Sequence, residues 1–341
     1  MKQAAQRILT GHRPTGPRHI GHLAGTLLNW ASLQDSHECY FLIADLHVLT
    51  TDYLHPGRIR ANILEVLADW LAAGIDPQRS RIVLQSAVPG HTQLNLLGML
   101  VSESRLRRVP TYKEQVQQLH LQPSLGLLCY PVLQAADILL YQAGAVPVGE
   151  DQLPHIELAR EIARRFNQLY GPLFPEPQAL LSSTPRLPGI DNRAMHTSYG
   201  NAIYLRDTSD ETARKVMSMY TDPTRIHASD PGRVEGNPLF IYLDTFNPDR
   251  DETAEFKQRY QAGKVGDVEI KVRLAGVLNR SLAPLRERRA ELMRHPGDLE
   301  AILMDGTRSA AALARETLAE AMERMGLSMG RNLRVSERLE E

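Results

Sequence analysis

The chain contains only two cysteines, Cys39 and Cys129, among its 341 residues. Two cysteines cannot build a disulfide framework, a four-cysteine zinc site or a four-cysteine iron–sulfur cluster. No uncharged apolar run reaches the roughly 18 residues that a membrane span needs, and residues 1–10 lack the apolar core of a signal peptide. We therefore expect a reducing, cytoplasmic location and no membrane contact.

Neither sign of charge is in excess, because 39 Lys and Arg residues stand against 40 Asp and Glu residues and give a net charge of −1. This balance excludes a globally basic coat for nucleic acid, although it is compatible with a local basic groove. The sequence also lacks internal repeats and long Gly/Ser-rich or charged linkers. With 43% apolar and 23% charged residues, the composition is typical of a globular protein with a large core.

Short apolar runs alternate with amphipathic segments through the first half of the chain. Strands are expected at residues 7–10, 39–44, 81–84 and 145–148. Helices are expected from residue 19 onward and at 59–70, 94–100, 127–141 and 158–169. Because strands that alternate with helices form parallel sheets, the pattern predicts a doubly wound, Rossmann-like α/β fold.

The pattern changes near residue 190, beyond which strand-like runs are scarce and helical periods dominate. Apolar residues recur at helical spacing over 274–282 and 312–325, which predicts a helical bundle. We therefore expect a first domain over residues 1–200 and a helical domain over 201–341. The polar segment 102–124 is expected to be an insertion in the first domain.

A glycine-rich turn follows the first expected strand and reads Thr-Gly-His-Arg-Pro-Thr-Gly-Pro-Arg-His-Ile-Gly-His over residues 10–22. In a doubly wound fold such a turn opens a helix whose free N–H groups and positive dipole end attract phosphate. His19 and His22 can donate hydrogen bonds to phosphate oxygens. Gly21 lets a flat group such as an adenine ring lie against the backbone. The turn therefore predicts a nucleotide site.

Two other segments carry polar groups where chemistry is expected. Asp137 lies in an apolar helix, where a carboxylate is costly unless it has a partner. That partner is either a protein group, such as a backbone N–H or an arginine, or the N–H of a ligand. The second segment, residues 146–152, ends a strand and begins a helix. There Gly149 permits close approach, Asp151 is either an N-cap or a ligand contact, and Gln152 can bond a carboxylate or an ammonium group.

These motifs resemble those of the bacterial-type tryptophanyl-tRNA synthetases, which are class I aminoacyl-tRNA synthetases. His-Ile-Gly-His at 19–22 reproduces the class I HIGH motif, and Val-Pro-Val-Gly-Glu-Asp-Gln at 146–152 matches the strand end of that family. Residues 130–141 resemble its tryptophan-pocket helix. Weaker likeness lies at 43–47, 217–223 and 235–238, so that the resemblance runs from about residue 10 to about residue 247.

The resemblance implies a tryptophan–tRNA ligase. Such an enzyme uses ATP to convert L-tryptophan to tryptophanyl-adenylate, releases pyrophosphate, and transfers the tryptophanyl group to tRNA(Trp). The resemblance also implies a homodimer, an anticodon-binding role for residues 201–341, and Mg²⁺ that accompanies the nucleotide phosphates without a metal site built from protein side chains. Arg286, Arg288 and Arg289 are then expected to form either a solvated helix face or a contact for tRNA phosphates.

The site roles implied by the resemblance fall into three groups. The catalytic residues are His19 and His22. The ATP-binding residues are Arg13, Pro14, Thr15, Gly21, His22, Gly149, Glu150, Asp151, Leu187, Ala194, Met195, His196, Thr197 and Ser198. The tryptophan-binding residues are Asp137, as acceptor of the indole N–H, with Tyr130, Gln152, Gly11 and His47.

The sequence departs from the family pattern at two places. The mobile loop that usually reads Lys-Met-Ser-Lys-Ser reads Ala-Met-His-Thr-Ser over residues 194–198, so both lysines are absent. Arg193 is expected to replace them in part, with the different reach of a guanidinium. Gln134 stands where relatives often place methionine, and it either faces the pocket or bonds the backbone. Two alternatives therefore stay open: a paralogue with weakened or lost aminoacylation, and a His-x-Gly-His nucleotidyltransferase.

Overall fold

The structure is a computed structural model that describes residues 6–110, 112, 116, 124–182, 186–195, 199–223, 225, 227 and 229–327. Its centre is a five-stranded sheet in the order β3-β2-β1-β4-β5, in which all neighbouring strands run parallel. The strands are β1 (Arg7–His12), β2 (Glu38–Ile43), β3 (Ser80–Leu84), β4 (Ala145–Val148) and β5 (Gln178–Leu181). The four expected strands and the doubly wound α/β fold are confirmed. The strand β5 was not predicted, because it is short and each of its residues keeps some exposure.

The order of the strands reverses at β1. The chain moves from β1 outward to β2 and β3, and then returns to the other side of β1 for β4 and β5. Ile8 of β1 pairs with Cys39 of β2 on one side and with Ala145 of β4 on the other. In such sheets the crevice outside the carboxyl ends of the two central strands is where ligands bind. This fold therefore offers a site between the segments that follow β1 and β4.

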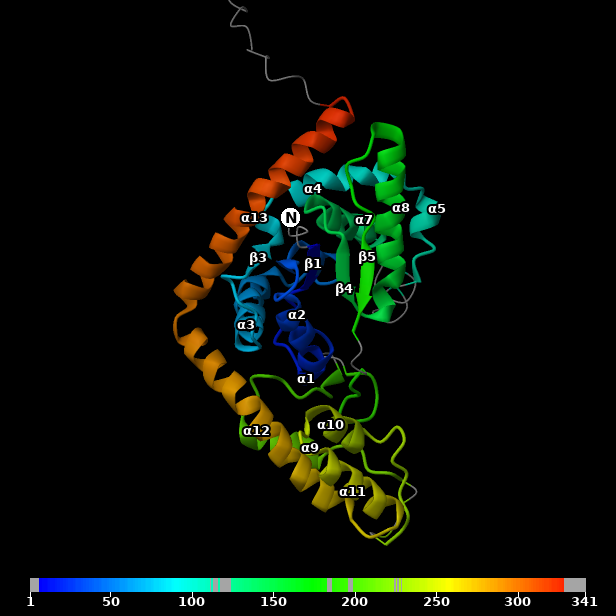
Figure 1. The fold of residues 1–341 in the computed structure, drawn as a ribbon, viewed down its shortest axis with the longest axis vertical. Coiled ribbons are helices and arrows are strands. Elements are labelled where there is room, and N and C mark those ends of the chain that lie inside the picture. Colours follow the sequence, from blue (N-terminus) through cyan, green and yellow to red (C-terminus); the bar gives the residue numbers. More distant parts are fainter. Residues whose placement is uncertain are drawn as a thin grey trace, which may run out of the picture.

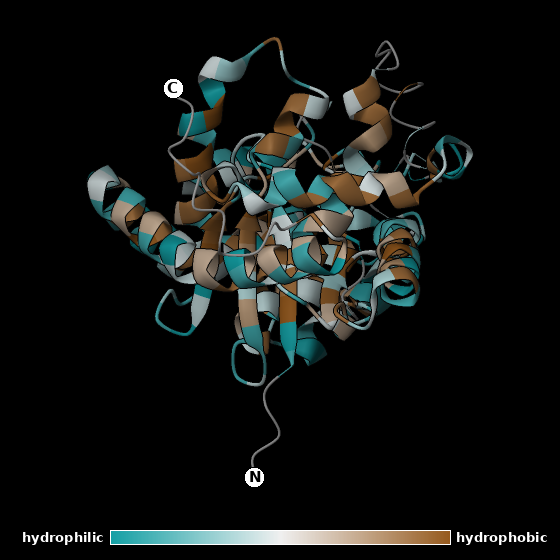
Figure 2. Cartoon of the chain, turned by 90° about the horizontal axis from the view of Figure 1, so that it is seen from above, coloured by the Kyte–Doolittle hydropathy of each residue, from teal (hydrophilic) through white to brown (hydrophobic). Residues whose placement is uncertain are grey.

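The helices of the first half cover both faces of the sheet (Figure 1). They are α1 (Ile20–His22), η1 (Leu23–Leu27), α2 (Leu28–Leu33), α3 (Ile59–Ala72), α4 (Gly90–Leu94), η5 (Asn95–Leu100), α5 (Glu103–Leu106), α7 (Leu125–Leu140) and α8 (Leu153–Tyr170). Single turns lie at η2 (Leu46–Thr50), η3 (Pro56–Arg58), η4 (Gln85–Ala87) and η6 (Glu150–Gln152). Figure 2 shows hydrophobic residues gathered on the strands and on the helix faces turned toward them.

The second half is helical in its described residues, as expected. It contains α9 (Ser209–Met217), α10 (Pro238–Phe246), α11 (Arg250–Gln261), α12 (Asp267–Arg294) and α13 (Pro296–Arg324). The long helices α12 and α13 run along one side of the molecule, from the helical part to the far end of the sheet part (Figure 1). No helix among the described residues is both long and apolar enough to cross a membrane.

The final helix α13 returns to the sheet and covers its β3 edge. The Leu84 N–H of β3 donates to the Thr307 hydroxyl of α13 over 3.0 Å, and Gly306 lies directly against the backbone of Ile82. An open strand edge is a hazard for aggregation, and a covering helix removes it. The expected division into domains 1–200 and 201–341 stays a prediction, and α13 packs on the sheet of the first of these two segments.

One buried apolar cluster joins the two halves. It extends from Phe41 of β2 through Trp70 of α3 to Tyr242 of α10 and Leu278 of α12. A second cluster on the other face of the sheet packs α7 and α8 and includes Ala310 of α13. The helical part is therefore packed against the sheet part through side chains of α3.

The close approach of α13 to β3 gives a test of this packing. A Cβ atom at Gly306 would lie 2.4 Å from the carbonyl oxygen of Ile82, and backbone atoms cannot turn away as side chains do. We expect Gly306→Ala to lower the free energy of unfolding by about 1–3 kcal/mol, the usual cost of overpacking. Urea unfolding measures the change.

Gly276 of α12 supplies the matched control, because no atom lies within 4 Å of the Cβ position there. Gly276→Ala is expected to raise the free energy of unfolding by up to about 1 kcal/mol through helix propensity. Equal effects of the two substitutions would contradict the close contact between α13 and β3.

Candidate active site

The turn after β1 brings the two motif histidines together. His19 is the N-cap residue of α1, and its ring lies against the ring of His22 with centroids 3.7 Å apart. The backbone N–H of His19 donates to Nδ1 of His22 over 3.3 Å. A Cβ atom at Gly21 would lie 2.9 Å from Nδ1 of His19, so glycine leaves the space that the His19 ring occupies. The expected pair of histidines is therefore one unit at the start of the helix.

A third imidazole, which the sequence analysis did not assign, supports this pair. His12 ends β1, stacks on Trp30 with centroids 4.5 Å apart, and meets the edge of the His22 ring at 5.1 Å. The indole N–H of Trp70 donates to its Nδ1 over 3.2 Å. Burial lowers the pKa of His12 well below its ordinary value, and the charge of Arg18 adds to this effect. His12 is therefore a neutral ring with its proton on Nε2.

The remaining expected ATP contacts follow β1 and β4, which are neighbours in the sheet. Of these residues Arg13, Thr15, Gly149, Glu150 and Asp151 are exposed, whereas Pro14 and Leu187 are buried. Because the two segments leave adjacent strands at the same edge, they flank the crevice where the strand order reverses. Their arrangement suits a nucleotide laid across the carboxyl ends of β1 and β4.

Asp137 lies buried on α7 and is held by side chains from three other segments. His47, which follows β2, places Nε2 at 2.8 Å from Oδ2 of Asp137. Gln85, which follows β3, donates to both carboxylate oxygens over 2.8 and 2.9 Å. His91 of α4 places Nδ1 at 2.7 Å from Oδ1 and bonds the hydroxyl of Tyr141 through Nε2 over 3.0 Å. The carboxylate therefore sits at the carboxyl ends of β2 and β3.

These donors decide the charge of Asp137. Burial alone would raise the pKa of this carboxyl, but the hydrogen bonds from His47 and His91 outweigh burial and lower the pKa to about 2. Asp137 is therefore an anion at neutral pH, as an acceptor of N–H groups must be. Of its partners, only His47 was anticipated as a site residue. Gln85 stands directly after an expected strand, and that position is the signal that would have identified it.

Gln134 belongs to a second chain of hydrogen-bonded polar side chains. Its Oε1 accepts from Nδ1 of His155 over 2.6 Å, and its Nε2 faces Oε1 of Gln152 at 3.4 Å. The other nitrogen of His155 lies 3.2 Å from the hydroxyl of Tyr130. Burial lowers the pKa of His155 to about 4, so the ring is neutral. Gln134 bonds side chains and not the backbone, and it links two residues expected to bind tryptophan.

Gly11 and His47 complete the expected tryptophan set. A Cβ atom at Gly11 would lie 2.0 Å from the carbonyl oxygen of Leu42, so the spacing of β1 and β2 requires glycine there. The ring of His47 lies 6.4 Å from the ring of Tyr130, edge toward face. His47 therefore lies between the Asp137 carboxylate, to which it is hydrogen-bonded, and Tyr130, which belongs to the polar chain of Gln134 and His155.

The lysine-free loop is described only in part. Residues 196–198 lie outside the described part of the chain, and the expectations for His196, Thr197 and Ser198 fall there. Ala194 is exposed, and Met195 is buried with its sulfur 3.3 Å from the Cβ position of Gly21. The first residues of the loop therefore pack directly on the turn that carries His19 and His22.

Arg193 is engaged within the base of the same loop. Its guanidinium forms an ion pair with Asp191, with Nη2 at 2.6 Å from Oδ2, and lies over the ring of Tyr199 at 5.6 Å from the centroid. Asn201 closes the base by donating to Asp191 and to the carbonyl of Ala194. The ion pair with Asp191 engages Nε and Nη2 of Arg193 and so holds the guanidinium at the base of the loop.

The arginine cluster on α12 differs from its expected role. Only Arg288 is exposed. Arg286 donates to the hydroxyl of Thr212 over 2.7 Å, and Arg289 is paired with Glu65 and Asp69 of α3. The prediction of a solvated face or a phosphate contact is therefore wrong for Arg286 and Arg289, because both guanidinium groups turn toward the protein.

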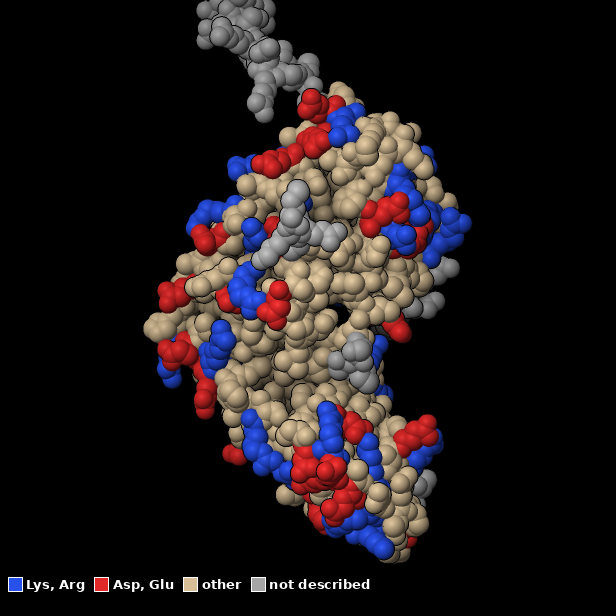
Figure 3. Space-filling view, viewed as in Figure 1, with Lys and Arg blue, Asp and Glu red and all other residues tan. Residues whose placement is uncertain are grey.

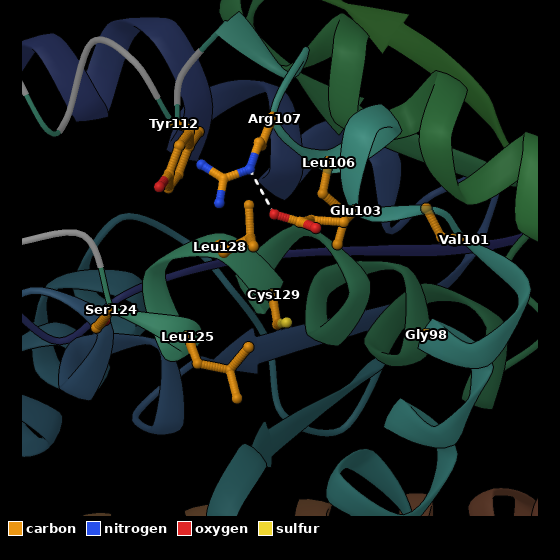
Figure 4. A pocket seen from close by; sticks show the side chains of 10 residues that line it. All are labelled: Gly98, Val101, Glu103, Leu106, Arg107, Tyr112, Ser124, Leu125, Leu128 and Cys129. Carbon is orange, nitrogen blue, oxygen red and sulfur yellow. Dashed lines mark hydrogen bonds and ion pairs between the residues drawn. The ribbon is translucent and has the colours of Figure 1, made fainter.

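A hollow of about 560 Å³ lies away from these groups, between α5 and the start of α7 (Figure 4). Leu106, Leu125 and Leu128 line it, and the ion pair of Arg107 with Glu103 spans 2.7 Å at its rim. None of the residues expected to bind substrate lines this hollow. We therefore place the candidate site at the carboxyl edge of the sheet, where the polar groups converge.

Charges of both signs are mixed on the surface. Figure 3 shows Lys and Arg interspersed with Asp and Glu on the face it draws, in keeping with the balanced sequence charge. Within the described residues, no group of three or more His, Cys, Asp or Glu side chains is placed to hold a metal ion. The expectation that Mg²⁺ arrives with the nucleotide stays a prediction.

The charge of Asp137 gives a pH-dependent test. Its pKa is lower in the folded chain than in the unfolded chain, so the stability it supplies is present above the unfolded value of about 3.9 and is lost as the pH falls toward 2. We expect this group to remove about 1 kcal/mol from the free energy of unfolding between about pH 4.5 and about pH 3.

Asp137→Asn isolates this contribution, since the amide does not titrate. Urea unfolding at both pH values should show a smaller loss of stability in the variant than in the wild type. Identical losses would mean that the hydrogen bonds from His47 and His91 do not stabilise the anion.

Known proteins with similar sequences and structures match nearly the whole chain. Residues 1–283 match the family described as tRNA synthetases class I (W and Y). The tryptophan–tRNA ligase of Chlamydia caviae is 51% identical over 340 residues, which cover 97% of this chain and 99% of that protein. The tryptophan–tRNA ligase of Treponema pallidum is 52% identical over 327 residues, which cover 94% of this chain and 97% of that protein.

A solved structure agrees with these matches. The tryptophanyl-tRNA synthetase of Campylobacter jejuni, complexed with ADP and tryptophan, has a TM-score of 0.85 and 33% identity, and covers 94% of this chain and 100% of that one. The nucleotidyltransferase alternative receives no support from any of these matches. The chain belongs to the class I tRNA synthetases of the tryptophan and tyrosine family.

Proposed function

We propose that this chain is a tryptophan–tRNA ligase. It activates L-tryptophan with ATP to form tryptophanyl-adenylate and pyrophosphate, and it then transfers the tryptophanyl group to tRNA(Trp). Relatives named as tryptophan–tRNA ligases at 51% and 52% identity support this activity, as does the Campylobacter jejuni structure with ADP and tryptophan. The match to the first of these relatives covers 97% of this chain and 99% of that protein, so the proposal draws on nearly the full length of both.

The observation that carries the proposal is the buried carboxylate of Asp137. An indole N–H is the polar group that distinguishes tryptophan from phenylalanine, and an anion in an apolar pocket accepts it strongly. His47, His91 and Gln85 fix the carboxylate before the substrate arrives. Tyr130 lies about two helical turns before Asp137, on the same side of α7, and its hydroxyl is itself held by His155. Tyr130, Gln152 and Gly11 would hold the amino-acid head group.

The activation step needs little covalent chemistry from the protein. A carboxylate oxygen of tryptophan attacks the α-phosphorus of ATP, and the bond from that phosphorus to the bridging oxygen of pyrophosphate breaks. Positioning and charge stabilisation supply most of the acceleration in such transfers. The paired rings of His19 and His22 lie at the helix start, where they would donate to the α-phosphate oxygens. His12 packs against the ring of His22. Because His12 is neutral, it does not compete with His22 for the negative charge of the phosphate.

The nucleotide would lie between the segments after β1 and β4. Arg13, Pro14, Thr15 and Gly21 would contact it from one side, and Gly149, Glu150 and Asp151 from the other. Met195 supports this placement, because it packs beside Gly21. Mg²⁺ would accompany the phosphates and neutralise part of their charge, held by phosphate oxygens and water more than by protein groups.

The partners are tRNA(Trp) and a second copy of the chain. Leu125, which lines the hollow near α5, is 75% exposed, and Met99 of η5 is 89% exposed. Exposed apolar side chains of this size are typical of contact surfaces when they gather in one region. Residues 201–341 would meet the anticodon.

The first test concerns the amino acid. Tryptophan should support ATP–pyrophosphate exchange and tyrosine should not, because a buried acceptor left without its donor is costly. Asp137→Ala should lose on the order of 2–4 kcal/mol in kcat/KM for tryptophan, as for a charged hydrogen bond in a buried site. Asp305→Ala, at an exposed carboxylate of α13, is the control and should change nothing. Wild-type kcat/KM in Asp137→Ala would refute the role of Asp137.

The second test concerns the lysine-free loop. Charge builds on the departing pyrophosphate, and one preorganised donor to such an anion is typically worth on the order of 10²–10³ in rate. Ala194→Lys combined with Thr197→Lys should therefore raise kcat for exchange at least about tenfold, equivalent to ~1.4 kcal/mol. Arg193→Ala should slow adenylate formation with little change in tryptophan affinity. Pre-steady-state adenylate formation measures both effects.

Arg308→Ala, which removes an exposed guanidinium of α13, controls for loss of positive charge. Unchanged rates in both loop variants would mean that another cation neutralises the pyrophosphate. A wild-type chain that binds tryptophan and ATP without any exchange would instead be the weakened paralogue.

A further inference from the structure

A second buried carboxylate, Asp69, shares no hydrogen-bond partner with Asp137 and has no role in the proposed reaction. It sits on α3 between the apolar residues Ala68 and Trp70, and its exposed fraction is 0%. Burial raises the pKa of Asp69, and the nearby charge of Arg289 opposes this shift. A carboxylate in such a place is costly unless polar groups pair with it. The groups that pair with Asp69 therefore indicate which parts of the chain it connects.

Each oxygen of Asp69 is bound by a different part of the chain. Oδ1 accepts from Nε of Arg289, on α12, over 2.6 Å. Oδ2 accepts from the backbone N–H of Arg18, in the turn after β1, over 2.7 Å. The other end of the Arg289 guanidinium pairs with Glu65, one turn earlier on α3. One carboxylate thus bridges the helical half of the chain and the nucleotide turn.

The Arg18 side chain extends this connection into the loop that precedes the motif histidines. Arg18 is 4% exposed, and its Nη2 donates to the carbonyl of Gly16 over 2.6 Å and to that of Arg13 over 3.3 Å. Its own carbonyl accepts from the N–H of Leu205 over 2.9 Å. Burial lowers the pKa of Arg18 to about 10, so the group keeps its charge at neutral pH. Arg18 therefore fixes the path of residues 13–18 from the inside.

We infer that Arg289, Asp69 and Arg18 form a positioning relay, through which helix α12 sets the conformation of the 13–18 loop and hence the affinity for ATP. The inference rests on the proposed function, since it takes that loop to be the ATP loop. None of the three residues touches the reacting atoms. They act through the backbone carbonyls and the N–H group that they hold. A relay of this kind changes the KM for ATP without changing that for tryptophan, because the Asp137 pocket is built from other segments.

Asp69→Asn tests the relay with little change of shape. The amide oxygen can still accept from the Arg18 N–H, but the amide NH₂ then faces the Nε–H of Arg289, and two donors cannot bond each other. Glu65→Gln is the matched control, because it alters a carboxylate on the same helix that binds the same guanidinium without touching the loop. Tryptophan-dependent ATP–pyrophosphate exchange gives the KM for each substrate. Calorimetry with a non-hydrolysable ATP analogue gives nucleotide affinity without tryptophan.

We expect Asp69→Asn to raise the KM for ATP about tenfold, as for a site displaced by a fraction of an ångström, and to leave the KM for tryptophan within about twofold. The analogue should lose affinity by a similar factor, and Glu65→Gln should leave both constants unchanged. Adding Arg289→Gln to Asp69→Asn should produce little further change, because residues in one relay are not additive.

Three outcomes would overturn the relay: an unchanged KM for ATP in Asp69→Asn, an equal rise for tryptophan, or an equal effect of Glu65→Gln. KM does not depend on the fraction of folded enzyme, so a variant that is only less stable keeps the wild-type KM and counts against the relay. These outcomes can be distinguished from failure of the proposed function. If the proposed function is wrong, the wild type itself will show no tryptophan-dependent exchange.

Discussion

The reversal of strand order at β1 is the constraint on which the rest of the structure depends. Because the strands are parallel, the segments that follow β1, β2, β3 and β4 all emerge at one edge of the sheet. The turn of residues 13–19 follows β1, His47 follows β2, Gln85 follows β3 and residues 149–152 follow β4. Residues that are far apart in the chain therefore meet without any long loop. The sheet thereby places the helix start that carries His19 and His22 at the same edge as the partners of a buried carboxylate.

Two buried carboxylates show how this edge is kept in place. Asp137 is surrounded by the side chains of His47, Gln85 and His91, and hydrogen bonds keep it ionised. Asp69 is paired with an arginine and with a backbone N–H. It therefore connects two parts of the protein and has no role in holding a substrate. Each satisfies the same rule that a buried charge needs complete partners. They differ in what lies next to them: the side chains of His47, Gln85 and His91 beside Asp137, and the backbone of a loop beside Asp69.

The helical half contributes more than a separate binding module. Helix α12 packs on α3 and supplies Arg289, while α13 covers the edge of β3 through Gly306 and Thr307. Through Asp69, Arg289 is linked to the backbone of the turn after β1, although it lies more than 200 positions later in the chain. The relay that we propose would transmit a displacement of α12 to that turn through the side chains of Arg289 and Asp69 and the backbone N–H of Arg18.

Much of this protein was determined by the sequence on its own. The alternation of apolar runs predicted four of the five strands and the parallel sheet, because a strand buried on both faces needs a continuous apolar run. The motifs His-Ile-Gly-His and Val-Pro-Val-Gly-Glu-Asp-Gln predicted the family, and the structure has the first of these segments after β1 and the second at the end of β4, since strand ends and helix starts have local signatures. The strand β5 was not predicted because its residues are partly exposed and do not form a buried apolar run.

Only the tertiary structure decided which polar side chains meet. Sequence patterns report whether a position is buried, but not what covers it. The partners of Asp137 come from three segments and those of Asp69 from two, at separations of 46 to 220 residues. The same limit made the α12 arginines look like a solvated face, although Arg286 and Arg289 turn inward. Gln134 shows it again: its identity was plain from the sequence, but its bond to His155 exists only because α7 and α8 pack side by side.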